Sequence, residues 1–168
     1  MKPSVLDEIV RFRQTRGEGP AGKFLQRLLA LTLLKAGYPV AEEYTVEGPD
    51  LLVGQFQIEV KTTTEEPFTI QDKDAQDIQE ATKKGKIPVL ALLECSSFRG
   101  WTVVHAQGLT RGEYRRGELA LRRIPELEKA VNEHFDVVVE TWMPLLNANP
   151  NAAFDQMDQR RRMGQWAP

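Results

Sequence analysis

The sequence is poor in cysteine and has no long hydrophobic run. Its single cysteine, Cys95, cannot form an internal disulfide bond, so we expect a reducing compartment such as the cytoplasm. The longest apolar run, residues 28–34, is much shorter than the about 20 residues that a helix needs to cross a bilayer. Residues 1–10 lack the apolar segment of a signal peptide. These absences predict a cytoplasmic protein that does not enter a membrane.

The chain also lacks a glycine-rich phosphate loop, a zinc motif and an excess of positive charge. Its formal net charge is −2, which argues against a general nucleic-acid coat protein. The charges are unevenly distributed: residues 42–80 contain eleven acids and two lysines, whereas residues 99–123 contain six arginines and two glutamates. This pattern favours a cation site beside an anion-binding surface, although solvated charged faces give the same pattern.

The length of 168 residues, with no internal repeat or linker, indicates one domain spanning residues 1–168. Periodicity and turn residues place the secondary structure. Helices are expected from Ser4 up to the Gly/Pro loop at 16–22, and at 22–36, 72–84, 125–134 and 150–163. Strands are expected at 38–46, 51–53, 56–60, 87–94 and 101–106, and residues 136–142 are either a strand or the start of a helix. This order predicts an α/β fold in which helices flank a mixed sheet.

The segment PDLLVGQFQIEVK, residues 49–61, contains two acids and a lysine among apolar residues. Glycine at the first of two turn positions, Gly54-Gln55, predicts a type II′ hairpin. That turn sets the register and pairs Val53 with Phe56, Leu52 with Gln57, Leu51 with Ile58 and Asp50 with Glu59. Because side chains alternate along a strand, Lys61 then lies on the same face as Glu59. The hairpin therefore brings two carboxylates and an amine together.

Two ionised acids this close destabilise each other unless a positive charge lies beside them. Lys61 alone meets this need in a purely structural ion cluster. Alternatively, Asp50 and Glu59, with the carbonyl oxygen of Val60, offer the hard oxygen ligands that suit Mg²⁺. The residues themselves leave both alternatives open.

Pro49-Asp50, a short hairpin and then Glu59-Val60-Lys61 resemble the signature of the PD-(D/E)XK nuclease superfamily. The surrounding helices and strands are most similar to those of archaeal-type Holliday-junction resolvases and restriction-endonuclease-like proteins. The resemblance covers about residues 20–106, and residues 107–168 are expected to add further α/β elements and a tail. It implies a restriction-endonuclease-like mixed β-sheet flanked by α-helices.

The resemblance also implies site residues. Asp50 and Glu59 would bind Mg²⁺, with Mn²⁺ as a substitute, and Val60 would add its carbonyl oxygen. Lys61 would orient or help to deprotonate the attacking water and stabilise charge on the phosphate. The bound metal would act as a Lewis acid and lower the pKa of its water. The partner would be DNA, and a homodimer would suit symmetric cutting.

The chain departs from the resolvase pattern in its first long helix. Resolvases carry a glutamate there that completes the metal site, whereas the matching residue is Gln26. Glu18, Glu42 and Glu43 are alternative sources of the missing acid. Gln76 and Gln79 are accessory candidates on the helix after the motif, and a solvated helix face is their simpler interpretation. No tyrosine follows them at the spacing of the exonuclease branch.

Arginines supply the candidate DNA-binding residues. Arg111, Arg115 and Arg116 surround a glycine, Gly112, and are interpreted either as phosphate contacts or as solubilising charge. The three arginines at 160–162, followed by Trp166, fit a basic-aromatic tail or a frayed terminus.

The leading hypothesis is a Mg²⁺-dependent DNA endonuclease that acts on branched or structured DNA. The alternative is a catalytically inactive module of the same fold that binds DNA or a protein partner. A third interpretation is an unrelated α/β protein in which Lys61 only neutralises two acids.

Overall fold

The computed structural model describes residues 1–41 and 51–168. Its elements are α1 (Pro3–Arg16), α2 (Glu18–Lys35), β1 (Val40–Ala41), β2 (Leu51–Val53), β3 (Phe56–Thr63), β4 (Phe68–Ile70), α3 (Asp72–Lys83), β5 (Ile87–Glu94), β6 (Trp101–His105), β7 (Gly112–Tyr114), the 3-10 helix η1 (Ala120–Arg122), α4 (Pro125–Ala148) and α5 (Pro150–Arg162). No helix within these ranges is long and apolar enough to span a membrane.

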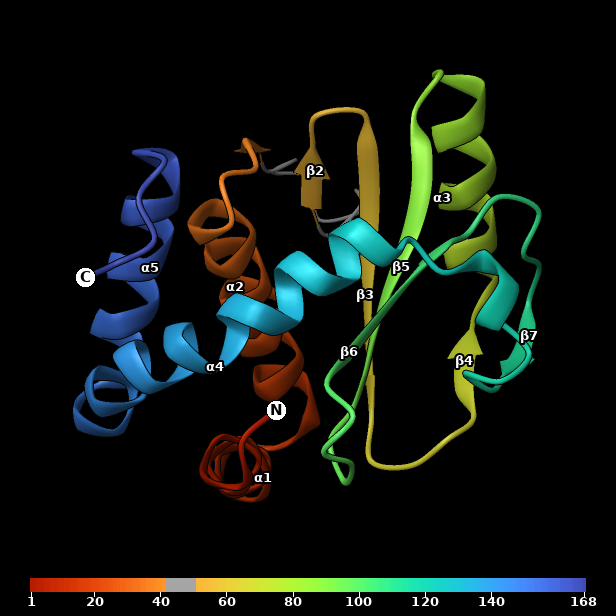
Figure 1. The fold of residues 1–168 in the computed structure, drawn as a ribbon. Helices are drawn as coiled ribbons and strands as arrows, with labels where there is room; N and C mark the ends of the chain where they lie inside the picture. The colour runs from red at the N-terminus through yellow and green to blue at the C-terminus, as the bar shows by residue number, and fades with distance from the viewer. Residues whose placement is uncertain (42–50) are drawn as a thin grey trace.

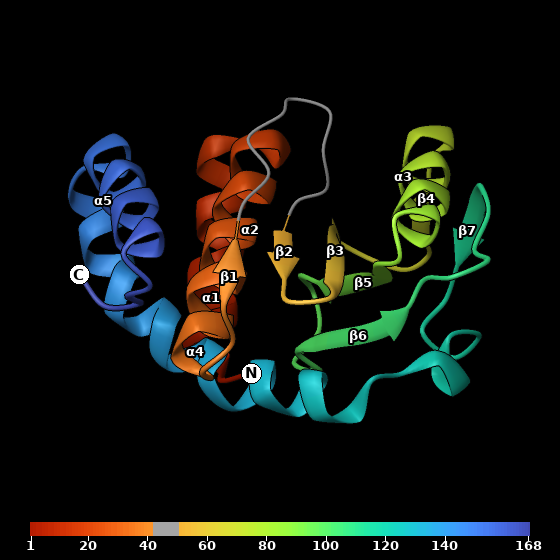
Figure 2. The same cartoon turned by 90° about the horizontal axis from the view of Figure 1, so that it is seen from above.

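Five strands form a mixed sheet in the order β1-β2-β3-β5-β6. β3 and β5 run parallel, and the other neighbours are antiparallel. The connection from β3 to β5 contains β4 and α3, and β4 pairs with β7 in a separate two-stranded ribbon. Figures 1 and 2 show α1, α2, α4 and α5 on one side of the sheet and α3 with the ribbon on the other. The mixed sheet flanked by helices is the predicted architecture.

The larger hydrophobic core fills the side of α1, α2 and α4. Ile58, Val89, Ala91 and Val103 contribute to it from β3, β5 and β6, and each is about 1% exposed. Burial of apolar surface stabilises the fold by about 25 cal/mol for each Å² removed from water. The side chains of β3 that do not enter this core therefore point to the opposite face of the sheet.

A smaller hydrophobic core lies on the opposite face of the sheet, under α3 and the ribbon. It contains Leu90 and Leu92 of β5, Val104 of β6, Ile78 of α3 and Phe68 of β4. Successive residues of β5 thus enter different cores, because side chains alternate along a strand. The continuous apolar run at 87–94 therefore forms a strand that is covered on both faces, as predicted.

The β2–β3 hairpin has the predicted turn and register. Gly54 has φ of +58°, and no non-glycine residue in the described part of the chain has a positive φ, which fits type II′ rather than type I′. The paired positions are Leu51 with Ile58, Leu52 with Gln57 and Val53 with Phe56. Asp50, the predicted partner of Glu59, lies outside the described residues.

The N-terminal boundary of α2 differs from the predicted one. The segment 16–22 was expected to be a loop, but α2 begins at Glu18 and contains most of it. Pro20 is tolerated because the first turn of a helix does not need its N–H, and Gly17, with φ of +87°, separates α1 from α2. The end is as predicted, since Gly37 has φ of +88° and follows the C-cap.

The expected helix end at residue 134 was wrong, because α4 continues to Ala148. Residues 136–142 are helical, which is the second of the two predicted alternatives. Phe135, Val138, Val139 and Trp142 are all buried, and their spacing places them on one helix face. Packing of this face outweighs the modest preference of valine for strands.

The C-terminal residues are packed on the protein rather than frayed. α5 ends one residue before the predicted position. Beyond it, the backbone oxygen of Trp166 accepts a hydrogen bond of 2.8 Å from the Trp142 indole. The Lys35 ammonium lies 3.7 Å from the centre of the Trp166 ring. These two contacts tie the tail to α2 and α4.

Candidate functional site

Glu59 and Lys61 occupy alternate positions of β3 and point away from the larger core. They pair in register with Leu90 and Leu92 of β5, which belong to the smaller core beneath α3. The intervening Val60 side chain packs against the larger core. The predicted division of β3 into a polar face and a core face is therefore confirmed for these residues.

The Lys61 ammonium lies between two carboxylates. It donates a hydrogen bond of 2.7 Å to Asp74 Oδ1 and lies 3.4 Å from Glu59 Oε1. The side chains of Lys61 and Glu59 are 22% and 18% exposed, and that of Asp74 is 7% exposed. A cation partly shielded from water thus contacts one buried acid and one acid that still reaches solvent.

The environment changes the pKa of Lys61 in opposing ways. Burial lowers the pKa of the ammonium, whereas its hydrogen bond to Asp74 and the Glu59 carboxylate raise it, and the net pKa lies above the ordinary value. Lys61 is therefore a stable cation at neutral pH in this structure. It is a source of positive charge rather than a ready proton acceptor.

Asp74 was not among the residues predicted from sequence. It is the third residue of α3 and forms a capping box with Gln71: its Oδ2 accepts a 2.7 Å hydrogen bond from the Gln71 N–H, and the Gln71 side chain accepts one from the Asp74 N–H. An acid three residues after a helix cap is a recognisable signal for this motif. Nothing in the sequence, however, indicates that the same acid reaches Lys61.

Gln57 and Asp77 line a narrow hollow together with Glu59 and Asp74. The Gln57 amide donates a hydrogen bond of 3.4 Å to the backbone oxygen of Asp77. Burial raises the pKa of the Asp77 carboxyl, although Lys73 opposes the shift. Polar side chains of β3 and α3 thus line this hollow, next to the carboxylates that contact Lys61.

Replacing Asp77 with asparagine should stabilise the protein at neutral pH. Because the folded state raises the pKa of Asp77 above 3.8, folding favours the protonated carboxyl, so the ionised form costs stability above that folded pKa. For a partly exposed residue we expect about 0.5 kcal/mol, or about 1–2 °C in melting temperature. The gain should shrink as the pH falls through the folded pKa and vanish below 3.8. Melting curves from pH 7 to pH 3 measure this, and a gain that stays constant with pH would show another cause.

The metal-ligand prediction rests partly on residues that the structure does not describe. Asp50, Glu42 and Glu43 are outside the described ranges. Within residues 1–41 and 51–168, no group of three His, Cys, Asp or Glu side chains is arranged to hold a metal ion. Of the carboxylates named as ligands or as substitutes, Glu59 and Glu18 are described, and Glu18 is an exposed residue at the start of α2 that pairs with Arg13 at 2.6 Å. The Glu59 oxygen is a hard donor of the kind that Mg²⁺ prefers.

The accessory candidates lie in two environments. Gln26 is half-buried on α2, and Gln76 and Gln79 are exposed on α3. On α3, the buried residues Ala75 and Ile78 face the sheet. Gln76 and Gln79 therefore lie on the solvent-facing side of α3, which agrees with the simpler interpretation of these residues.

The three candidate DNA-binding arginines also separate. Arg111 and Arg115 are exposed and flank β7 on either side. Arg111 Nη1 donates a hydrogen bond of 3.0 Å to Asp72 Oδ2, so β7 lies against the first residue of α3. Two of the three arginines are therefore accessible to a large ligand, and Arg111 lies next to α3, which carries Asp74.

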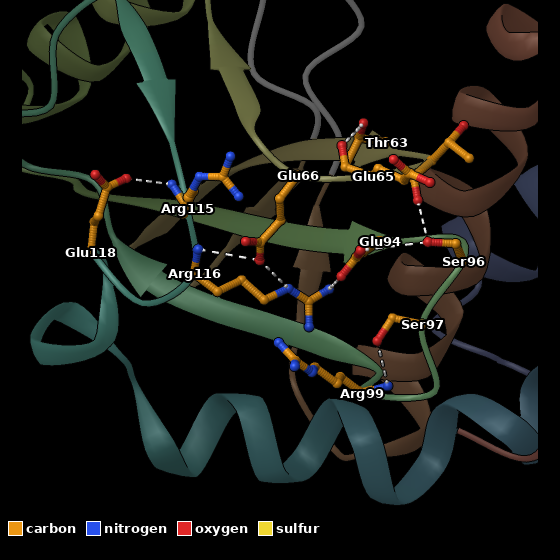
Figure 3. A network of polar contacts seen from close by, with 11 residues as sticks. Thr63, Glu65, Glu66, Glu94, Ser96, Ser97, Arg99, Arg115, Arg116 and Glu118 are labelled. Carbon is orange, nitrogen blue, oxygen red and sulfur yellow. Dashed lines mark hydrogen bonds and ion pairs between the residues drawn. The ribbon is translucent and has the colours of Figure 1, made fainter.

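Arg116 is built into the protein instead. Its side chain is only 10% exposed and forms ion pairs with Glu66, at 3.4 Å, and Glu94, at 3.9 Å. Figure 3 shows the guanidinium between these two carboxylates, beside the end of β5. Burial lowers the pKa of Arg116, although both carboxylates raise it. Arg116 thus ties the loop after β7 to the main sheet.

Comparison with known proteins identifies the fold. Neither a protein-family model nor a curated protein matches the chain. Among solved structures, it is similar to Hjc, a Holliday junction resolvase from the archaeal hyperthermophile Archaeoglobus fulgidus, with a TM-score of 0.51 and 21% sequence identity. The match covers 64% of this chain and 95% of the resolvase. The chain therefore has the mixed-sheet fold of the resolvase and of restriction-endonuclease-like proteins, as its residues predicted.

Proposed function

We propose that this protein is a divalent-metal-dependent endonuclease that hydrolyses phosphodiester bonds in DNA, and that its substrate is branched DNA. One observation carries the proposal. In the fold of a Holliday junction resolvase, Glu59 and Lys61 project from one face of a central strand, with their charged atoms 3.4 Å apart. This combination suits phosphodiester hydrolysis, because a metal-binding oxygen and a fixed cation can act on the same phosphate.

Two residues of β3 are proposed as ligands of the metal ion. Glu59 would hold the metal ion with Asp50, and the Val60 carbonyl oxygen is a further candidate ligand. A bound Mg²⁺ supplies a Lewis acid and a water of lowered pKa. Mg²⁺ commonly uses only one or two carboxylates and keeps several waters, so the half-buried Glu59 carboxylate, which still reaches solvent, fits this requirement.

Lys61 would stabilise the negative charge that develops on the phosphate. Its ammonium is held in place before the substrate arrives, so little reorganisation is needed during the reaction. The raised pKa of Lys61 suits a permanent cation. We therefore assign the lysine to orientation of the attacking water and to charge stabilisation.

Binding of DNA would depend on a local positive surface, since the net charge of the chain is −2. Arg111 and Arg115 are the exposed candidates: the contact between Arg111 and Asp72 places Arg111 near the N-terminus of α3, and Arg115 follows the other end of β7. Asp74, which contacts Lys61, belongs to the same helical turn. A backbone bound along β7 would therefore lie close to the proposed reaction centre.

A catalytically inactive DNA-binding module is the second candidate. Gln26 stands where resolvases carry an acid, and the Lys61 charge is already balanced by Asp74 and Glu59. If the cluster were purely structural, replacing Glu59, Lys61 and Asp74 together with Gln, Met and Asn would be neutral or stabilising. The triple replacement would also leave unchanged both the DNA affinity and the effect of divalent metal on that affinity.

The test uses a four-way DNA junction and a linear duplex of the same sequence. Purified protein should cut the junction with Mg²⁺ or Mn²⁺, cut the duplex more slowly, and cut neither in excess chelator. Equal cutting of both substrates would retain the nuclease and reject the branched substrate. Binding of the junction without cutting, with either metal, would favour the inactive module.

A further inference from the structure

Asp74 connects the first turn of α3 to the lysine of β3 through hydrogen bonds that its two carboxylate oxygens accept. Its Oδ1 accepts a 2.7 Å hydrogen bond from the Lys61 ammonium, and its Oδ2 accepts a 2.7 Å hydrogen bond from the Gln71 N–H. The residue is 5% exposed. Both carboxylate oxygens therefore have defined partners in a site that water barely reaches.

The capping role alone does not explain this arrangement. A capping box needs one oxygen of the acid at this position, to accept from the backbone N–H of the cap residue. The other oxygen is directed at Lys61, 13 residues earlier in the chain. Asp72 and Lys73, in the same turn, are exposed. Burial is thus specific to the one acid that reaches β3.

We propose that Asp74 is a positioning residue that fixes the Lys61 ammonium beside Glu59. This inference rests on the proposed nuclease function, and it adds a residue outside the Asp-Glu-Lys signature of β2 and β3. Asp74 is itself anchored, because its second oxygen is held by the backbone of Gln71. The first turn of α3 therefore sets where the lysine charge lies.

The physical reason is the flexibility of lysine. Its ammonium is a compact charge at the end of a four-carbon stem, and an unrestrained ammonium would spread over many rotamers. Neighbouring groups that lock the side chain before substrate binds remove this cost from the reaction step. The short charge-assisted contact to Asp74, together with the 3.4 Å approach to Glu59, provides such a restraint.

Asp74→Asn tests the proposal, with Gln71→Ala as its matched control. Asparagine is neutral and has one acceptor oxygen, whereas Lys61 and the cap use different oxygens of Asp74. The charge-assisted contact with Lys61 is therefore lost, whichever partner the amide oxygen keeps. Gln71→Ala removes the other half of the capping box and leaves the contact between Asp74 and Lys61 in place. The two variants thus separate loss of the cap from loss of the restraint.

We expect Asp74→Asn to reduce the single-turnover cleavage rate at saturating junction DNA by about 10- to 100-fold, with unchanged DNA affinity. Gln71→Ala should lower the melting temperature and leave the rate of the folded enzyme at the wild-type value. A purely structural role for Asp74 predicts instead that both variants change rate in proportion to the folded fraction. That result would overturn the proposal.

A second readout does not require cleavage. NMR relaxation of the Lys61 side chain reports its order, which should fall in Asp74→Asn and stay unchanged in Gln71→Ala. Equal order in wild type and Asp74→Asn would overturn the proposal even if both cut DNA. Conversely, a wild-type protein that fails to cut would overturn the proposed function, while the order parameters still decide whether Asp74 restrains Lys61.

Discussion

Replacing Glu59 with glutamine or Lys61 with methionine is expected to reduce the single-turnover rate of DNA cleavage by about 100-fold or more. Glu59→Gln keeps the size of the side chain but replaces a charged oxygen ligand with a neutral amide. Lys61→Met keeps the stem and removes the cation that lies 3.4 Å from Glu59. In the proposed reaction, metal, lysine and phosphate act together, so either loss alone is severe.

A matched pair of control variants lies at the exposed C-terminal end of α3. Glu80 and Lys84 form an ion pair of 4.0 Å, and their side chains are 62% and 65% exposed. Glu80→Gln and Lys84→Met therefore repeat the same chemical changes where solvent screens the charges, and their rates should stay within about twofold of wild type. Circular dichroism and melting curves establish that all four variants are folded. Folded Glu59→Gln and Lys61→Met that cut at the rates of the controls would contradict the assignment.

The second large effect is expected on stability. Arg116→Met should lower the free energy of unfolding by about 2 kcal/mol, because it leaves two partly buried carboxylates without their cation. The cost is below that of a fully buried pair, since Glu66 and Glu94 are 17% and 16% exposed. Methionine retains much of the apolar stem that packs near Phe68, whose ring centre is 5.7 Å from the guanidinium carbon.

Guanidinium denaturation measures this effect, and a combined variant separates charge from packing. Adding Glu66→Gln and Glu94→Gln to Arg116→Met removes the unpaired charges and should recover most of the lost stability. If Arg116→Met were as stable as wild type but bound DNA with a weaker salt dependence, Arg116 would be a phosphate contact instead. The Arg116 side chain is 10% exposed and lies between the two carboxylates in Figure 3, which argues for the stability effect.

The β2–β3 hairpin shows how much of this fold the sequence predicts. Gly54 at the first turn position and the alternation of Phe56, Ile58 and Val60 with polar residues fix both the turn and the register, and local rules suffice for these. The run at 87–94 likewise predicts a strand covered on both faces. In each case the signal lies within about ten residues.

Longer elements needed tertiary information. Residues 136–142 have a valine-rich composition that fits a strand, and their place in α4 follows from the face that they bury against other elements. The pairing of β4 with β7 joins Phe68 to Tyr114, which are far apart in the chain. No local pattern in either segment indicates such a partner.

The contacts of the candidate site also include some that local sequence patterns predict and some that depend on tertiary packing. The common face of Glu59 and Lys61 follows from strand alternation and was predicted. The contact between Lys61 and Asp74 depends on how α3 docks on the sheet, and the distinct burial of Arg116 depends on the loop after β7. The charged residues can be identified from the sequence, but which of them contact each other depends on the packing of helices and loops.

Titration with Mn²⁺ by calorimetry tests the central claim, that β3 presents a metal-binding carboxylate beside a fixed ammonium. The wild-type protein should bind the ion, and Glu59→Gln should lose this binding while Glu80→Gln retains it. Because heat is measured in the absence of DNA, the result does not depend on the choice of substrate. Binding of the same strength in wild type and Glu59→Gln, or no binding by either, would contradict the account.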